Sequence, residues 1–171
     1  MSTGLDRLNS LPPEQAEAEL LKCCASRRWA STIADSRPFA NVDQLFEKAE
    51  GVWRSLGGVD WLEAFHAHPR IGEQKAAESE EARDWSAQEQ SGTRDASAET
   101  IVALAAGNHE YERRFGFIFI ICASGKSSDE MLVILNSRLR NSSESELRIA
   151  AEEQRKITRL RLEKLLKNLG R

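Results

Sequence analysis

Apolar residues recur along most of the chain at spacings of three and four, which is the spacing of one buried face on an α-helix. Between residues 14 and 25, for example, Ala16, Leu20, Leu21 and Cys24 repeat at these intervals. Similar patterns fill most of the remaining sequence. The pattern therefore predicts an all-α protein.

Capping residues indicate where the predicted helices begin and end. A polar residue followed three positions later by an acidic or amide residue is typical of a helix start, and glycine or proline is typical of a helix end. These signals predict seven or eight helices, including those over 14–25, 41–53, 60–68, 80–90, 97–114, 127–135 and 143–169. Pro69 is expected to end its helix at His68, and residues 72–84 are expected to form a surface loop that leads into the next helix.

One apolar run does not follow the helical pattern. Residues 117–122 read Phe-Ile-Phe-Ile-Ile-Cys, which is typical of a buried strand. No second segment of this kind exists to pair with it, so we expect a short extended connector inside the core. We find no repeat or linker, and the sequence predicts a single compact domain over residues 1–171.

The composition of the chain argues against several classes of function. With 40% apolar and 30% charged residues the chain is predicted to be a soluble globular protein, and a net charge of −3 argues against a nucleic-acid partner. The longest apolar stretch, residues 115–123, is much shorter than the roughly 20 residues that a membrane-spanning helix needs. No targeting segment is visible, so we expect a cytoplasmic protein without a membrane partner. The three cysteines fit no disulfide framework and are expected to be reduced and buried.

Two of the three histidines lie close together, at His66 and His68. Such a pair could bind a metal with His109 or a carboxylate as the third ligand, and a hydrolase of that kind would lose activity with chelators. Alternatively, the two rings only cap a helix end. His68 differs from His66 because Pro69 and Gly72 hold it at a rigid turn, where an imidazole could transfer protons.

A second cluster contains Ser86, Glu89 and Gln90. At helical spacing these side chains share one face, which could hold a polar ligand or could simply face solvent. In the last predicted helix, Arg161 falls within the apolar arc. A buried guanidinium needs an anion, so an internal acid or a ligand carboxylate should meet it. Arg159 lies outside that arc and is expected to face solvent.

These residues fall in four ordered motifs that strongly resemble the 2-oxo-4-hydroxy-4-carboxy-5-ureidoimidazoline (OHCU) decarboxylase family of urate degradation. The motifs are W-L-E-A-F with H-P-R-I-G at 61–72, S-x-x-E-Q at 86–90, N-x-x-Y with F-G-F-I-F at 108–119, and I-T-R-L-R-L at 157–162. The resemblance covers nearly the whole chain. It implies an all-helical, cofactor-independent, usually homodimeric carboxy-lyase that forms (S)-allantoin from OHCU.

The resemblance also implies the roles of individual residues. It implies that the pocket is lined by His68, Ser86, Glu89, Gln90 and Arg161. We expect His68 and Glu89 to act in catalysis, and we expect substrate binding by Pro69, Ser86, Gln90, Phe117, Ile118, Phe119, Ile120, Ile121 and Arg161. No metal is expected, because the ring C=N of the substrate can itself accept the electrons that carbon dioxide leaves behind. The protein would then supply positioning and proton delivery, with His68 polarised by Glu89. Besides the metal-dependent hydrolase, a non-catalytic helical interaction domain is the alternative; it would not respond to purine-pathway intermediates.

Overall fold

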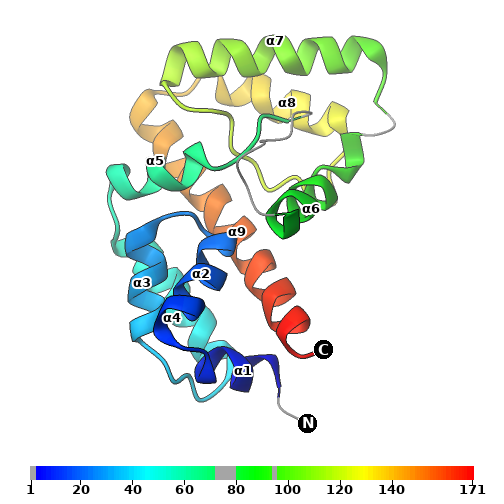
Figure 1. Cartoon of the computed structure of the whole chain (residues 1–171). Helices are drawn as coiled ribbons and strands as arrows, with labels where there is room; N and C mark the ends of the chain where they lie inside the picture. The colour runs from blue at the N-terminus through cyan, green and yellow to red at the C-terminus, as the bar shows by residue number, and fades with distance from the viewer. Residues whose placement is uncertain (1–2, 72–79, 94–95) are drawn as a thin grey trace. The chain divides into compact units, whose positions relative to one another are not determined.

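The computed structural model describes residues 3–71, 80–93 and 96–171. In these ranges the chain forms nine α-helices and one short 3₁₀-helix, with no strand, so the all-α prediction is confirmed for this part of the chain. The helices group into two compact units (Figure 1). The terminal unit contains the residues up to 64 and from 155 onward, and the central unit contains residues 65–154.

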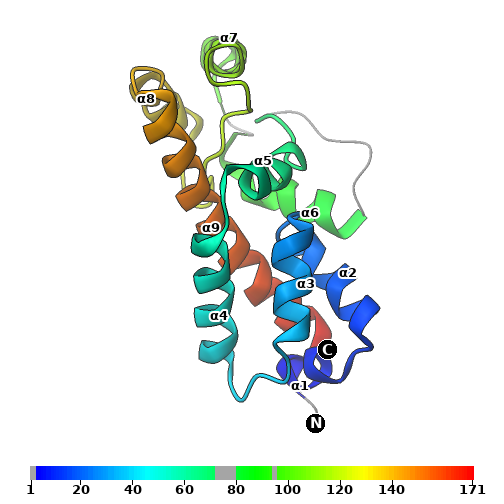
Figure 2. The same ribbon diagram turned by 90° about the vertical axis from the view of Figure 1, so that its left-hand side faces the viewer.

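The terminal unit holds the first helices of the chain and the second part of the last one. Its helices are α1 (Gly4–Ser10), α2 (Pro13–Cys23), α3 (Arg27–Asp35), α4 (Val42–Ser55), most of α5 (Gly58–His66) and the end of α9 (Ser143–Leu169). Helix α3 packs against both α2 and α4 (Figure 2). The side chain of Asn41 accepts a hydrogen bond from the Gln44 N–H, so the predicted cap of this helix is confirmed.

Large side chains fix the packing inside the terminal unit. Trp29 on α3 is fully buried, and its indole N–H donates to the carbonyl of Ala49 on α4 at 3.0 Å. At the start of the chain, α1 approaches the end of α9 so closely that a Cβ on Gly4 would collide with the Leu166 carbonyl oxygen. Only glycine allows this approach of two backbones.

The central unit contains a pair of parallel helices. Its elements are α6 (Glu80–Glu89), the 3₁₀-helix η1 (Ser91–Thr93), α7 (Ala98–Phe115), α8 (Ser128–Arg138) and the start of α9. The Thr100 hydroxyl donates to Asp129 at the start of both helices, whereas Arg138 donates to the Tyr111 hydroxyl near their ends. Helices α7 and α8 therefore run in the same direction, side by side (Figure 1).

Residues 117–123 return the chain from the end of α7 to the start of α8. We call this segment the connector; it forms neither helix nor strand, and all of it is buried except the half-buried Ile118. The prediction of a buried connector is thus confirmed. Arg138 donates to the Ile120 carbonyl at 2.6 Å and to the fully buried Glu146 carboxylate at 2.5 Å. This ion pair holds the middle of the connector in place.

Several boundaries differ from those predicted. The count of seven or eight helices is too low, because α1 and α3 were missed; both are short, and neither shows more than one or two turns of apolar periodicity. Helix α5 ends at His66 rather than at His68, which lies in the turn that follows. Of the predicted loop, residues 72–79 lie outside the described part of the chain, and residues 80–84 begin α6. None of the described helices combines the length and the apolar character needed to span a membrane.

Candidate functional site

His68 lies in a turn that neighbouring elements hold in place. Its backbone N–H donates to the Phe65 carbonyl at 3.1 Å, and the Phe65 ring packs on Phe117 of the connector with 5.4 Å between ring centroids. Two residues further along, the Arg70 guanidinium forms two hydrogen bonds to the Glu112 carboxylate on α7, at 2.7 and 2.9 Å. The turn is therefore tied to α5, to the connector and to α7.

The ring of His68 has a partner that sequence reasoning missed. Its Nε2 lies 2.5 Å from Oε1 of Gln154 on α9, a residue 86 positions away in the chain. The Gln154 side chain is fully buried. Its position was visible in the sequence, because Gln154 lies four residues after Ala150 and three before Ile157, on the apolar face of α9. A polar residue on such a face is a signal for a buried partner.

Helix α6 carries the second predicted cluster. Ser86 and Glu89 are 5% and 8% exposed, so the interpretation of this face as a solvated surface is wrong for both residues. Gln90 is half-buried just beyond the helix end, where its N–H donates to the Ser86 carbonyl at 3.1 Å. A buried carboxylate needs compensating partners, which is typical of functional groups rather than of surface residues.

Glu89 lies near the connector. Burial raises the pKa of the Cys122 thiol, and the negative charges of Glu153 and Glu89 raise it further. The Cys122 N–H also donates to the Glu153 carboxylate at 2.8 Å, and its carbonyl accepts from Lys126 at 2.8 Å. The carboxylates of Glu89 on α6 and Glu153 on α9 therefore both act on Cys122 of the connector.

The connector also presents backbone donors. In the part of the chain that the structure describes, the N–H groups of Ile118, Phe119 and Ile121 take part in no hydrogen bond. Phe119 and Ile121 are nevertheless buried. Buried N–H groups without a partner are rare in folded proteins, and a bound ligand is one way to satisfy them.

Arg161 is buried in the terminal unit, and Arg159 is not. The Arg161 guanidinium is on the face of α9 that contacts α2, where it donates to the Lys22 carbonyl at 3.3 Å. Burial raises the pKa of the adjacent Cys24 thiol to about 12, and the charge of Arg161 opposes this rise. Arg159 is 45% exposed and pairs with Glu50 at 3.2 Å. The helical wheel therefore assigned both arginines to the correct faces.

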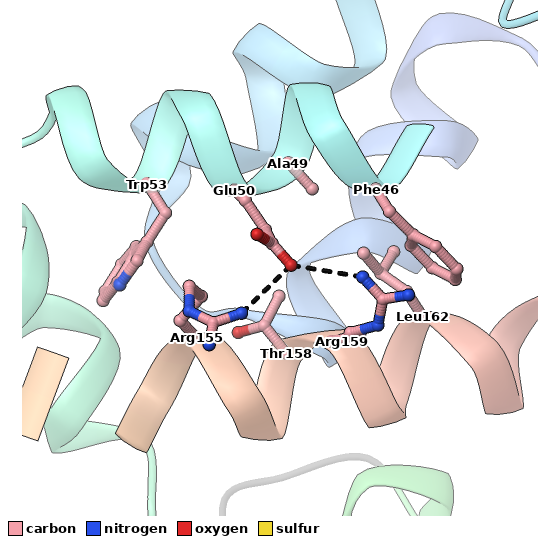
Figure 3. A pocket seen from close by; sticks show the side chains of 8 residues that line it. All are labelled: Phe46, Ala49, Glu50, Trp53, Arg155, Thr158, Arg159 and Leu162. Atoms are coloured by element: carbon pink, nitrogen blue, oxygen red, sulfur yellow. Dashed lines mark hydrogen bonds and ion pairs between the residues drawn. The ribbon is translucent and has the colours of Figure 1, made fainter. Parts of the chain in front are cut away.

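Two pockets in the described residues do not coincide with the predicted site. The first lies between α4 and α9 of the terminal unit, and the Glu50 carboxylate at its wall accepts from Arg155 at 3.0 Å and from Arg159 (Figure 3). The second opens in the central unit at the starts of α7 and α8; its wall includes Ser97, Lys126 and Ser127. None of the residues assigned to substrate or catalysis lines either pocket.

The structure therefore divides the predicted residues between the two units. His68, Pro69, the α6 cluster and the connector all belong to the central unit, and Arg161 belongs to the terminal unit. Among the described residues, no three His, Cys, Asp or Glu side chains are grouped so that they could hold a metal ion. His66 and His109 are both exposed. The arrangement gives no support to a metal-dependent hydrolase built on the histidine pair.

Comparison with known proteins connects this arrangement to a family. The OHCU decarboxylase family profile matches residues 9–163. The "Uric acid degradation bifunctional protein TTL" of Arabidopsis thaliana is 39% identical over 154 residues, which cover 89% of this chain and 48% of that protein. The bifunctional protein PucL of Bacillus subtilis is 26% identical, covering 97% of this chain and 33% of its own length. The chain thus spans half or less of these two bifunctional relatives.

Shorter relatives and solved structures agree with this assignment. A protein of Haloferax volcanii named 2-oxo-4-hydroxy-4-carboxy-5-ureidoimidazoline decarboxylase is 31% identical, covering 78% of this chain and 79% of its own. The crystal structure of an OHCU decarboxylase in the presence of (S)-allantoin superposes with a TM-score of 0.76 and 40% identity, covering 87% of this chain and 97% of that one. An (S)-allantoin synthase, at 19% identity and a TM-score of 0.71, shares the fold. The chain belongs to the OHCU decarboxylase family.

Proposed function

We propose that this chain is a carboxy-lyase that decarboxylates OHCU to (S)-allantoin in urate degradation. The observation that carries this proposal is that one compact unit contains the half-buried His68 together with the buried Ser86 and Glu89, all three at positions of the family motifs. It is supported by the 40% identity to an OHCU decarboxylase whose crystal structure is described as in the presence of (S)-allantoin.

The proposed reaction needs little beyond positioning and proton transfer. Carbon dioxide leaves from a ring carbon next to a C=N bond, and that bond accepts the remaining electron pair. The substrate thus provides its own electron sink, and we propose no metal or other cofactor. A group held at a fixed distance and angle from one ring face supplies the proton.

His68 is the proposed proton-transfer group. It takes the proton of the substrate hydroxyl and helps to deliver a proton to one face of the ring. Its turn is tied down by the Arg70–Glu112 pair, and its ring by Gln154. Glu89 assists as a buried carboxylate close to the connector.

The remaining residues bind the substrate. Ser86 and Gln90 bond its ureido and ring amide groups, Pro69 packs against it, and the N–H groups of the connector are the donors for its ring oxygens. Arg161 holds an anionic or carbonyl group of the substrate, because its buried guanidinium presents donors in a planar fork.

The test uses the handedness of the product. OHCU is generated freshly from urate by upstream enzymes, and circular dichroism follows the formation of optically active allantoin. The intact protein should give (S)-allantoin faster than the substrate decays to the racemate. Glu89→Gln and His68→Asn should slow the catalysed route until the signal falls towards zero. A folded His68→Asn protein with wild-type turnover would refute the proposed proton route.

We further propose that the protein acts in the cytoplasm as a homodimer, as the resemblance implies. Sedimentation equilibrium then gives twice the chain mass of 19.2 kDa at assay concentrations. A monomer with full activity would contradict the dimer and would leave the decarboxylase activity itself intact.

A further inference from the structure

We infer that Gln154 is a positioning residue that fixes the tautomer and the orientation of the His68 ring. The inference rests on the proposed role of His68 as the proton-transfer group. Its basis is one contact: Oε1 of the fully buried Gln154 lies 2.5 Å from Nε2 of His68. The two residues are far apart in the chain and come from different elements of the central unit, so the contact is a product of the fold.

The chemistry of the amide determines which nitrogen carries the proton. A carboxamide oxygen only accepts hydrogen bonds, so the Nε2 of His68 must donate. A neutral imidazole has a single N–H, and the other nitrogen then carries the free electron pair. In the neutral ring, Gln154 therefore assigns the proton to Nε2 and the lone pair to Nδ1, the tautomer in which Nδ1 is the basic atom. Because an amide carries no charge, it selects this tautomer without favouring the imidazolium form as a carboxylate would.

Gln154 is well placed to hold the ring rigidly. Ala150, one turn earlier on α9, is fully buried as well, so the side of the helix that carries Gln154 cannot turn towards solvent. The neighbouring residue, Glu153, accepts the N–H of Cys122 at 2.8 Å. Two successive side chains of one helix thus contact the histidine ring and the connector. The ring is fixed relative to the backbone donors proposed to bind the substrate.

Two substitutions of Gln154 distinguish a role in positioning the His68 ring from a role in packing alone. Gln154→Met keeps the length of the side chain and loses the acceptor, whereas Gln154→Glu keeps an acceptor oxygen and introduces a charge. If Gln154 positions the ring, kcat falls by roughly ten- to hundredfold in the Met variant, with KM within about twofold. Because the carboxylate of the Glu variant favours the imidazolium form, the variants are compared at alkaline pH, where the ring is neutral; there the Glu variant retains more activity than the Met variant. A packing role predicts the reverse order, because an apolar side chain is easier to bury than a charge.

The tautomer can be observed without any activity measurement. Long-range ¹H–¹⁵N correlation spectra of the ¹⁵N-labelled protein show which ring nitrogen carries the proton, and the His68→Asn variant identifies the His68 signals. We expect the Nε2–H form alone in the wild-type neutral ring and a mixture of tautomers in the Met variant. An Nδ1–H ring in the wild type, or the same tautomer in both proteins, overturns the inference.

A matched control accounts for general loosening of α9. Ala150→Gly weakens the same helix one turn away and leaves the Gln154–His68 and Glu153–Cys122 hydrogen bonds without any change of partner; it should lower the melting temperature and leave kcat unchanged at temperatures where the protein is folded. Different results would reject the role of Gln154 and the proton route through His68. Loss of activity in His68→Asn with full activity in Gln154→Met rejects only the role of Gln154, whereas full activity in His68→Asn rejects the proposed proton route.

Discussion

The buried ion pair in the central unit gives a quantitative test of what holds the connector in place. Glu146 is fully buried and accepts from three side chains: the Tyr111 hydroxyl at 2.6 Å, Arg138 at 2.5 Å and the Asn141 amide at 3.0 Å. Arg138, 6% exposed, uses another of its N–H groups for the Ile120 carbonyl. Replacing Glu146 by Gln keeps the shape of the side chain and removes the charge that balances Arg138.

The expected cost of Glu146→Gln is large. Removing one partner of a buried ion pair leaves an uncompensated charge in the core, which costs about 3–5 kcal/mol of the free energy of unfolding. A domain of this size is stable by only about 5–15 kcal/mol, so the loss is a substantial part of the total. Because Arg138 also holds Ile120, we expect activity to fall together with stability.

Urea unfolding followed by far-UV circular dichroism measures this loss. Two controls accompany it. Glu144→Gln removes an exposed ion pair with Arg148 on the same helix and should leave the midpoint unchanged. Tyr111→Phe removes the hydroxyl that donates to Glu146 and accepts a longer bond from Arg138, but it leaves the ion pair intact. Loss of the bond to the Glu146 carboxylate should cost about 1.5–3 kcal/mol, less than Glu146→Gln. If Glu146→Gln loses no more than Tyr111→Phe, the carboxylate is not what compensates Arg138, and the reasoning is wrong.

Three further results are expected. Arg161→Ala should lower kcat/KM by ten- to hundredfold, about 1.5–3 kcal/mol, and Arg159→Ala should lower it much less; equal losses in steady-state assays would contradict the assigned roles. Burial raises the pKa of the Cys24 thiol from 9.0 to about 12, so the folded protein keeps a proton that the unfolded chain loses. Stability should therefore fall as the pH rises from 9 towards 12, and Cys24→Ala should remove this part of the decline in thermal melts. Gly4→Ala should lower the melting temperature because its Cβ meets a backbone carbonyl of α9, whereas Gly51→Ala, whose Cβ meets open space in a helix, should raise it.

Local signals predicted most of the fold. The caps at Asn41, Ser97 and Ser127 all accept the expected backbone N–H, because a cap depends only on residues within one turn. Helices α1 and α3 were missed because a short helix is stabilised chiefly by what it packs on, which the chain around it does not encode. The end of α5 was misplaced for the same reason, because contacts with the connector and α7 hold the turn that contains His68, and these residues are distant in the sequence.

In the candidate site, too, features set by a local pattern could be predicted, and features set by distant contacts could not. The helical wheel alone placed Arg161 on a buried face, since the apolar pattern of α9 is long and regular. The burial of Ser86 and Glu89 was not predictable from α6, which has little apolar character of its own and is covered by other parts of the chain. Gln154 was missed because its partner lies 86 residues away. Its location on an apolar face was the available clue.

The parallel arrangement of α7 and α8 has a consequence for how the sequence can change. Two successive helices that run in the same direction oblige the chain to travel back along their whole length, and here it does so through the interior. Loops usually tolerate inserted and deleted residues because they lie at the surface. In the connector one extra residue would move Ile120 away from Arg138 and Cys122 away from Glu153, and its side chain would have to fit among residues that are already buried. The length of this loop is therefore fixed as strictly as the composition of a core.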